Sequence, residues 1–301
     1  MVNITESIST LRTAVATAVL TVSRPETIAA VENRQVPKGD VFEFSRAAGL
    51  LAVKKTSDVI PDCHPLPIEY ASITHRIEDL RIHIRVEVHT VYRTGVEVEA
   101  MHGAAVTALT MYDMLKPLDK GIRISDICVE EKTGGKSERR HPTDLRCAVI
   151  VCSDSIAQGV KEDSAGKNVI ALLETQGLPV DAYEVLPDEV SAIRAKALEL
   201  SGAGYDLVLF TGGTGLSPRD VTPEAVSPLF DRTVPGIMEA ARSFGQDRTP
   251  YAMLSRGVAG FIGKTLVLTL PGSTRGARET LHALFPHILH IFTVAQGARH
   301  E

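Results

Sequence analysis

The chain has 301 residues, of which 44% are hydrophobic and 23% charged, with a formal net charge of −5; this composition excludes a low-complexity protein and argues against nucleic acid as a general partner. The four cysteines form no CxxC pair or disulfide framework, no basic and then apolar leader opens the chain, and no apolar run is long enough to span a membrane. We therefore expect a soluble, cytoplasmic protein of two domains, without nucleic-acid or membrane partners.

The first half of the chain has an α+β pattern. A turn at residues 36–40 holds Lys38 before a predicted helix over Ser45–Val59, which carries Lys54. The string IPDCHPLP then holds His64 between prolines that restrict the backbone. Residues 82–92 alternate apolar and polar, which predicts a half-buried antiparallel strand.

The segment from Gly95 to Gly121 is the richest in ionisable residues at regular spacing. Its start predicts a short strand with Glu97 and Glu99 on one face, followed by a helix over residues 101–115. Asp113 and Lys116 fall in the last turn of that helix, at the spacing of an ion pair. The segment is either a helix-end ion pair with two solvated glutamates or part of a site.

Lysines, a rigidly held histidine and carboxylates together suit a phosphorylated substrate that undergoes proton transfers. Lys132 and Lys136 flank the glycines of EKTGGKS, within the polar segment 131–146 that predicts the domain boundary. Structural alternatives stay open: solvated lysines, a satisfied turn histidine at His64 and a small buried hydrophobe at Cys63.

The strings KGD, AAG-x5-K, CHPLP, TGVEVEAM, ALTMYDM-x-K and EKTGGKS, in this order, resemble the cyclic pyranopterin monophosphate synthase family. The resemblance covers residues 1 to about 138. It implies a ferredoxin-like fold, a hexamer with sites between subunits, and conversion of 3′,8-cyclo-7,8-dihydro-GTP to cyclic pyranopterin monophosphate and diphosphate. It also implies a catalytic Asp113 with the acid–base residues Lys38 and Lys116. The substrate contacts that it implies are Arg12, Cys63, His64, Val98, Glu99 and Lys132. Lys54 and Glu97 belong to the same motifs and are further candidates for substrate binding.

The sequence departs from that family's pattern at three places. Asp62 adds a negative charge before the Cys-His pair, Asn3 replaces a common aspartate, and His102-Gly103 replaces small or hydroxylated residues. We expect Asp62 to place its charge near the substrate's phosphates, and His102-Gly103 to alter substrate packing.

The second half has a different pattern. Short, continuous apolar runs at 145–152, 205–211 and 266–270 alternate with predicted helices over 166–176 and 189–200. Buried strands that alternate with helices predict a three-layer α/β domain with a mostly parallel sheet. We therefore divide the chain into domains 1–140 and 141–301.

A glycine-rich loop follows the middle of these three runs. Its exposed amides and hydroxyls suit an anion at the end of a strand, although a tight turn is the simpler alternative. After it, Asp220 precedes a helix for which we predict Thr222 as the N-cap. Asp188 is either a carboxylate of the site or the N-cap of the helix over 189–200. A further loop includes Arg275, which is available for a phosphate. The candidate ligand-binding residues of both loops are Thr211, Gly212, Gly213, Thr214, Gly215, Ser217, Gly272 and Ser273.

The strings SDS-x3-G-x3-D-x2-G, LPDE, TGGTG-x3-RDVTPEA and LPGS together resemble the molybdopterin-binding domain family, which includes molybdopterin adenylyltransferases. The resemblance spans residues 143 to 295 and implies a trimeric α/β domain that activates molybdopterin with Mg-ATP. It assigns Asp188 and Asp220 to the catalytic centre and, as ligands, to Mg²⁺. Some members bind the pterin without clear catalysis, so a non-catalytic binding or assembly module is the alternative. The sequence thus predicts a bifunctional enzyme of molybdenum cofactor biosynthesis that forms a homo-oligomer, a trimer or a hexamer, with pterin and nucleotide substrates.

Overall fold

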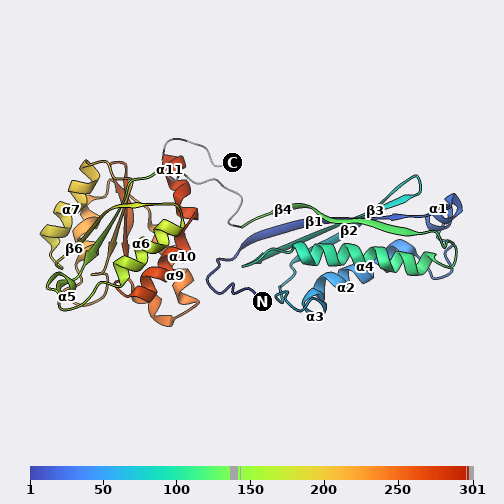
Figure 1. Ribbon diagram of the computed structural model, residues 1–301, viewed down its shortest axis with the longest axis horizontal. Coiled ribbons are helices and arrows are strands. Elements are labelled where there is room, and N and C mark those ends of the chain that lie inside the picture. The colour runs from blue at the N-terminus through green and yellow to red at the C-terminus, as the bar shows by residue number, and fades with distance from the viewer. Residues whose placement is uncertain (136–141, 143, 296, 298–301) are drawn as a thin grey trace. The chain divides into compact units, whose positions relative to one another are not determined.

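The computed structural model describes residues 1–135, 142, 144–295 and 297, and the chain divides into two compact units, residues 1–138 and 139–301 (Figure 1). Lys136 lies outside the described residues. Within the residues that the structure describes, none of the helices combines the length and apolar character that crossing a bilayer requires.

The N-terminal unit is a four-stranded antiparallel sheet with helices packed against it. The strands lie in the order β2-β3-β1-β4, and their bounds are Thr10–Thr21 (β1), Tyr70–Glu78 (β2), Arg81–Tyr92 (β3) and Arg123–Thr133 (β4). The helices are Pro25–Glu32 (α1), Val41–Lys54 (α2) and Thr56–Val59 (α3), all between β1 and β2, and Glu97–Leu115 (α4), between β3 and β4.

Helices α2 and α4 pack closely because glycines line their contact. A Cβ on Gly49 would lie 2.0 Å from Thr107 Oγ1, and one on Gly103 would lie 2.6 Å from Val53 Cγ2. Thr56 Oγ1 and His102 Nδ1 are 3.2 Å apart, so the C-terminal end of α2 lies beside the first half of α4. In this unit, His102 and Gly103 therefore serve the packing of helices.

Two sequence predictions in this unit are wrong in detail. The single helix predicted over residues 45–59 begins earlier, at Val41, because the Asp40 side chain caps it by accepting from Phe42 N and Glu43 N at 3.1 Å each; it ends at Lys54, before α3. The predicted strand with Glu97 and Glu99 is instead the first turn of α4. Acidic residues are favourable at the N-terminal end of a helix, so these glutamates stabilise the first turn of α4 although their alternation with apolar residues resembles a strand.

The C-terminal unit contains a six-stranded mixed sheet in the order β6-β5-β7-β10-β9-β8. Strands β6, β5, β7 and β10 are parallel, and β9 pairs antiparallel with β10 and β8, so the predicted mostly parallel sheet is confirmed. The strand bounds are Cys147–Cys152 (β5), Val180–Leu186 (β6), Leu207–Thr211 (β7), Arg232–Thr233 (β8), Ala259–Ile262 (β9) and Thr265–Leu270 (β10).

Helices cover both faces of this sheet, with α7 on one side and α6, α9 and α10 on the other (Figure 1). The α-helices are Asp154–Ala157 (α5), Ala165–Thr175 (α6), Val190–Gly202 (α7), Thr222–Val226 (α8), Pro235–Gln246 (α9), Thr274–Leu284 (α10) and His290–Ala295 (α11). Short 3-10 helices span Ser227–Leu229 (η1), Pro250–Leu254 (η2) and His287–Leu289 (η3).

Asp163 explains one of the sequence motifs structurally. Its carboxylate accepts from Gly166 N at 2.8 Å, Lys167 N at 3.2 Å and the Tyr183 hydroxyl at 2.8 Å. It thereby satisfies amides in the first turn of α6 and ties that helix to β6. The D-x2-G part of the sequence motif, Asp163 to Gly166, therefore marks the start of a helix.

Candidate functional sites

A carboxylate held between two lysines lies at the C-terminal end of α4. Asp113 Oδ1 is 2.8 Å from Lys116 Nζ, and Asp113 Oδ2 is 2.6 Å from Lys38 Nζ. The Lys38 ammonium also donates to the Asp113 carbonyl oxygen at 2.9 Å. The hydrogen bonds from Lys116 and Lys38 lower the pKa of Asp113 to about 2. The group therefore offers an ionised carboxylate and two ammonium groups at the surface.

A second polar group surrounds the N-terminal end of α4. The Cys63 thiol donates to Glu99 Oε1 at 3.4 Å, and Lys132 Nζ is 3.3 Å from Glu97 Oε1. Glu99 is only 3% exposed, and this burial raises its pKa. Burial, and then the Glu99 charge, raises the pKa of Cys63 to about 11, so the thiol stays protonated at neutral pH.

His64 and Asp62 contact the start of the chain. His64 Nε2 is 2.9 Å from the carbonyl oxygen of Val2, and the Met1 ammonium is 2.5 Å from Asp62 Oδ1. The ammonium lowers the pKa of Asp62. The negative charge that Asp62 adds to the sequence is therefore paired within the chain.

Arg12 lies at the same end, where β1 begins. A Cβ on Gly135 would lie 2.1 Å from Arg12 Nη1, and one on Gly134 would lie 3.1 Å from Arg12 Cδ, so the two glycines allow the backbone to wrap around this side chain. Both have positive φ, which glycine adopts readily. The Arg12 Nε atom is buried and has no hydrogen-bond partner among the described residues. Of the other predicted ligands, Lys54 ends α2 at the surface, and Val98 is exposed in the first turn of α4.

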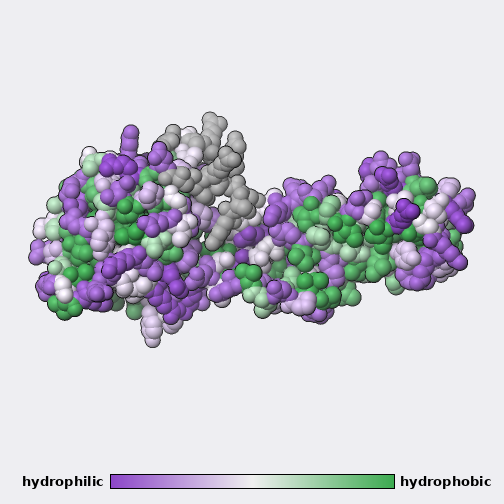
Figure 2. All heavy atoms as spheres, viewed as in Figure 1, coloured by the Kyte–Doolittle hydropathy of each residue, from purple (hydrophilic) through white to green (hydrophobic). Residues whose placement is uncertain are grey.

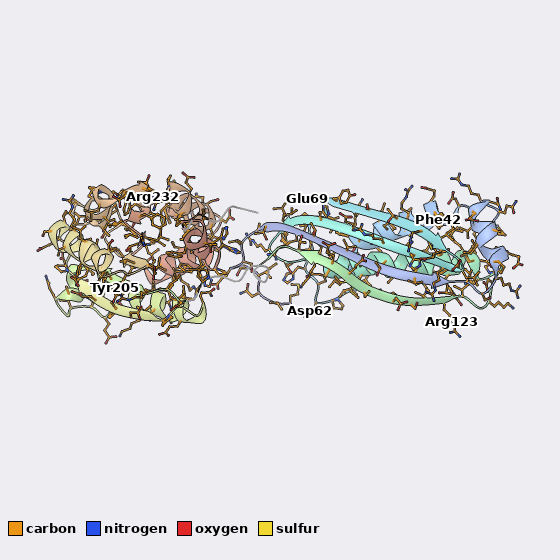
Figure 3. All side chains as sticks on the ribbon, turned by 90° about the horizontal axis from the view of Figure 1, so that it is seen from above. Phe42, Asp62, Glu69, Arg123, Tyr205 and Arg232 are labelled. Carbon is orange, nitrogen blue, oxygen red and sulfur yellow. The ribbon has the colours of Figure 1, made fainter. Side chains whose placement is uncertain are left out.

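The predicted constellation of the first domain falls into two separate groups. Asp113 is fourteen positions after Glu99 in α4, which is about 21 Å at the helical rise of 1.5 Å per residue. Figure 3 shows Asp62, next to Cys63 in the sequence, toward one end of the unit and Phe42, close to Lys38 in the sequence, toward the other. One chain therefore does not bring Glu99 and His64 to Asp113.

The second candidate site is at the carboxyl ends of the parallel strands in the C-terminal unit. Asp154 N donates to Asp188 Oδ2, and Asp188 N donates to Asp154 Oδ1, each at 3.0 Å. Burial, and then the charges of Asp154 and Asp220, raises the pKa of Asp188. Asp188 Oδ1 is buried and has no hydrogen-bond partner among the described residues. Asp188 is thus not an N-cap, since Glu189 occupies that position of α7.

The glycine loop encloses this carboxylate. A Cβ on Gly213, whose φ is +59°, would lie 3.1 Å from Asp188 Oδ1 and 2.3 Å from Thr222 Oγ1. A Cβ on Gly215 would lie 2.8 Å from Asp220 Oδ2, which in turn accepts from Ser217 N at 2.8 Å. Glycines are therefore required where the loop passes the two aspartates.

Several predicted hydroxyls of this loop have structural roles or are buried. Thr211 donates to the Pro271 carbonyl oxygen at 2.9 Å, and Thr214 is buried. Thr222 is not the N-cap of α8: Val221 occupies that position, and the fully buried Thr222 Oγ1 accepts from no amide of the helix. Ser273 caps α10 by accepting from Gly276 N at 3.2 Å. Arg275 pairs with Glu279 at 2.8 Å.

Three further residues of this site were not assigned a role from the sequence. Asp154 belongs to the SDS motif and Arg219 precedes Asp220, so both motifs contained the signal. Arg256 lies 31 residues beyond Ala225, the end of the loop motif, and no motif of the sequence indicated it. Its backbone N donates to Thr214 O at 3.2 Å, and its guanidinium donates to Gly215 O at 2.7 Å and to Asp220 O at 2.6 Å and pairs with Glu224. It thus fastens both ends of the 215–220 turn.

A cavity of about 260 Å³ lies beside the loop that follows β10. Pro271 and Ser273 form part of its wall, and most of the other lining residues belong to α9, η2 and α10. Most of the lining side chains are apolar or neutral, with Arg242, Arg275 and Glu279 as the charged ones. Within the described residues, no group of three His, Cys, Asp or Glu side chains has the geometry of a metal site.

Gly213→Ala is expected to destabilise the protein by about 2 kcal/mol more than Gly159→Ala. Both glycines have positive φ, at +59° and +68°, but a Cβ on Gly159 would meet nothing within 4 Å. The midpoint of chemical unfolding of the full chain measures the difference. Equal unfolding midpoints for the two variants would contradict the proximity of Gly213 to Thr222 and Asp188.

Comparison with known proteins agrees with the division into two units. Residues 1–135 match the MoaC family model, and residues 148–290 match the model of a probable molybdopterin binding domain. The chain is 42% identical over 278 residues to a molybdenum cofactor biosynthesis bifunctional protein of Chlorobaculum tepidum, covering 92% of this chain and 88% of that one. The chain belongs to the family of bifunctional molybdenum cofactor biosynthesis proteins.

Other relatives of this bifunctional protein match it in whole or in part. A molybdenum cofactor biosynthesis bifunctional protein of Synechococcus elongatus is 36% identical over 291 residues, which are 92% of this chain and 91% of the relative. A cyclic pyranopterin monophosphate synthase of Thermomicrobium roseum is 45% identical over 139 residues, 46% of this chain and 83% of the relative. The predicted fusion of two biosynthetic domains is confirmed.

Proposed function

We propose that the N-terminal unit converts 3′,8-cyclo-7,8-dihydro-GTP to cyclic pyranopterin monophosphate and diphosphate, and that the C-terminal unit transfers AMP from Mg-ATP to molybdopterin. The synthase assignment is supported by the similarity to a named synthase and, above all, by the Lys38–Asp113–Lys116 cluster. In this proposal the protein acts in the cytoplasm.

The two lysines suit both binding and proton transfer. Each ammonium contacts the Asp113 carboxylate, which holds both lysines beside each other at a surface that a phosphorylated substrate can reach. The group at the other end of α4 offers donors for the pterin and phosphates from Arg12, His64 and Lys132, and a buried acid, Glu99. A reaction that uses both groups requires a second subunit.

We therefore propose a homo-oligomer, a hexamer of the N-terminal units with trimeric C-terminal units, in which each synthase site takes one end of α4 from each of two chains. The separation of about 21 Å between Glu99 and Asp113 supports this arrangement. Figure 2 shows hydrophobic residues over the face of α2, α3 and α4, where large apolar side chains are exposed: Phe44, Leu51, Val59, Val98 and Leu109. Contiguous exposed apolar surface is typical of an interface. The strand order and the β-α-β-β-α-β sequence support a ferredoxin-like fold for each subunit.

Mixing two inactive variants tests this shared site. His64→Ala and Asp113→Asn are each expected to lose synthase activity, because each removes one of the two groups. Co-expressed and randomly assembled, they are expected to recover about a quarter of the wild-type activity, since about one site in four then takes an intact group from each chain. No recovery in verified mixed oligomers would show that each site lies within one chain.

The adenylyl transfer is supported by the glycine loop and by the two aspartates beside it. Asp188 Oδ1, which is buried and has no hydrogen-bond partner among the described residues, is a suitable ligand for a hard divalent cation. The glycine loop passes both this carboxylate, at Gly213, and that of Asp220, at Gly215. Mg²⁺ usually keeps several waters and needs one or two carboxylates together with the substrate phosphates, which suits this donor set. When bound, the cation supplies charge neutralisation at the transferring phosphate.

The chain's own residues would bind and orient the two substrates. The amides of residues 213–215 can hold the nucleotide's phosphates, because the Gly212 amide already donates to the Leu270 carbonyl oxygen. The cavity lined by Pro271 and Ser273 has room for the pterin. The alternative is a C-terminal unit that binds the pterin without turnover. ATP-dependent formation of adenylylated molybdopterin by the full chain tests the proposal, and pterin binding with no AMP transfer would establish the alternative.

A further inference from the structure

Arg219 occupies an unusual position among the carboxylates of the second site. Its Nε is 3.0 Å from Asp154 Oδ2, and its Nη2 contacts the same oxygen. The other Asp154 oxygen accepts from the Asp188 amide, so the Arg219 guanidinium occupies the oxygen of Asp154 that no other described residue binds. The pair lowers the pKa of Asp154 and raises that of Arg219.

The charges around Arg219 leave the site negative. Asp154, Asp188 and Asp220 bring three carboxylates, which Arg219 only partly offsets, so two net negative charges remain when all three are ionised. A triphosphate adds further negative charge and would be repelled unless cations accompany it. One divalent cation offsets the two net negative charges of the protein, so the triphosphate still needs a positively charged side chain.

Arg219 is available for this purpose, and Arg256 is not. The Arg256 guanidinium is already bound to two carbonyl oxygens and the Glu224 carboxylate. The Arg219 side chain is 65% exposed and binds a single carboxylate oxygen. An exposed ion pair of this kind contributes little free energy, so replacing it costs little. Arginine also matches the geometry of phosphate oxygens.

We propose that Arg219 is an exchangeable counterion that binds Asp154 in the absence of ligands and moves to a phosphate of the nucleotide when a divalent cation takes its place at Asp154. This inference rests on the proposed adenylyl transfer. It makes Arg219 a nucleotide-binding residue and Asp154 a ligand of the cation in the loaded site. The exchange would couple cation binding to nucleotide binding. A cation that binds Asp154 releases Arg219 for the phosphate, and a nucleotide that binds Arg219 releases Asp154 for the cation.

The two roles predict opposite effects of one substitution. In Arg219→Gln, Mn²⁺ without nucleotide is expected to bind roughly threefold to fivefold more tightly, because it no longer displaces the guanidinium from Asp154. The KM for Mg-ATP is expected to rise about tenfold or more, because the phosphate loses its arginine. Arg219→Lys is expected to recover part of the KM, since a lysine retains the charge without the bidentate geometry.

The measurement is Mn²⁺ binding to the full chain by electron paramagnetic resonance, with steady-state adenylyl transfer on the same samples. Arg232→Gln serves as the control, because Arg232 is an exposed arginine that stacks on Phe261 at the opposite edge of the sheet (Figure 3). Asp154→Asn is expected to weaken Mn²⁺ binding. Weaker or unchanged Mn²⁺ binding in Arg219→Gln, or an unchanged KM for Mg-ATP, would overturn the inference. Its failure is distinct from that of the proposed function, in which the wild-type chain itself transfers no AMP.

Discussion

Asp113→Asn is expected to reduce synthase turnover by roughly 10²- to 10⁴-fold while leaving adenylyl transfer unchanged. The substitution removes the carboxylate that positions Lys38 and Lys116, at 2.6 and 2.8 Å. It retains the size of the side chain, so the packing of α4 is preserved. Diphosphate release and pterin formation from the cyclised GTP measure the first activity, and AMP transfer by the same sample measures the second.

The pH dependence of synthase activity shows how Asp113 acts on Lys116. Because the pKa of Asp113 is about 2, its ionisation does not produce an acid limb at neutral pH. Asp113 raises the pKa of Lys116, so in Asp113→Asn the pKa of Lys116 falls toward its ordinary value. If Lys116 acts in its protonated form, the alkaline limb of the residual activity is therefore expected to move to lower pH.

Asp58→Asn is the matched control for this prediction. Asp58 is also an exposed aspartate in a helical turn that pairs with a lysine three residues away, Lys55, at 2.8 Å. Among the described residues, no second lysine pairs with Asp58, and the sequence predicts no role for this ion pair, so its loss is expected to leave turnover within about twofold. Equal effects of the two substitutions would mean that the Asp113 cluster is only a surface ion pair.

The parts of the fold that could be predicted from the sequence are those with strong local periodicity. The alternation at residues 82–92 correctly predicted β3, and the apolar runs of the second half correctly predicted β5, β7 and β10. The alternation at 96–99 instead predicted a strand that is a helix start. A pattern of four residues is compatible with a strand or with one turn of a helix, and the packing of α4 against α2 favours the helix.

The site residues could be predicted better than their arrangement. Motifs identified Asp113, Lys38 and Lys116, which do meet in space, and Asp188 and Asp220, which both lie beside the glycine loop. The distance from Glu99 to Asp113 depends on how far α4 extends without a break, which motif spacing does not reveal. Arg256 was missed because it comes from a segment that only the folded sheet brings to the loop.

Asp188→Asn and Asp220→Asn are each expected to abolish detectable AMP transfer and to leave synthase turnover unchanged. Each removes a negative charge that the proposed cation requires, and Asp188 Oδ1 has no other partner to compensate among the described residues. Because burial raises the pKa of Asp188, wild-type transfer is expected to decline on acidification at a pH above the ordinary range of aspartate. Mn²⁺ binding provides a readout that is independent of turnover, and both variants are expected to bind the ion more weakly.

Asp231→Asn is the control for these two substitutions. Like Asp220, Asp231 accepts a hydrogen bond from a backbone amide at a turn, that of Gly263 at 2.6 Å, but it follows η1 on the way to β8. Asparagine can still accept this bond, so normal AMP transfer is expected. If Asp188→Asn or Asp220→Asn also silenced the synthase, the two reactions could not be independent. The assembly of the oligomer would then couple the units, because a synthase site formed by two chains fails whenever the chains separate.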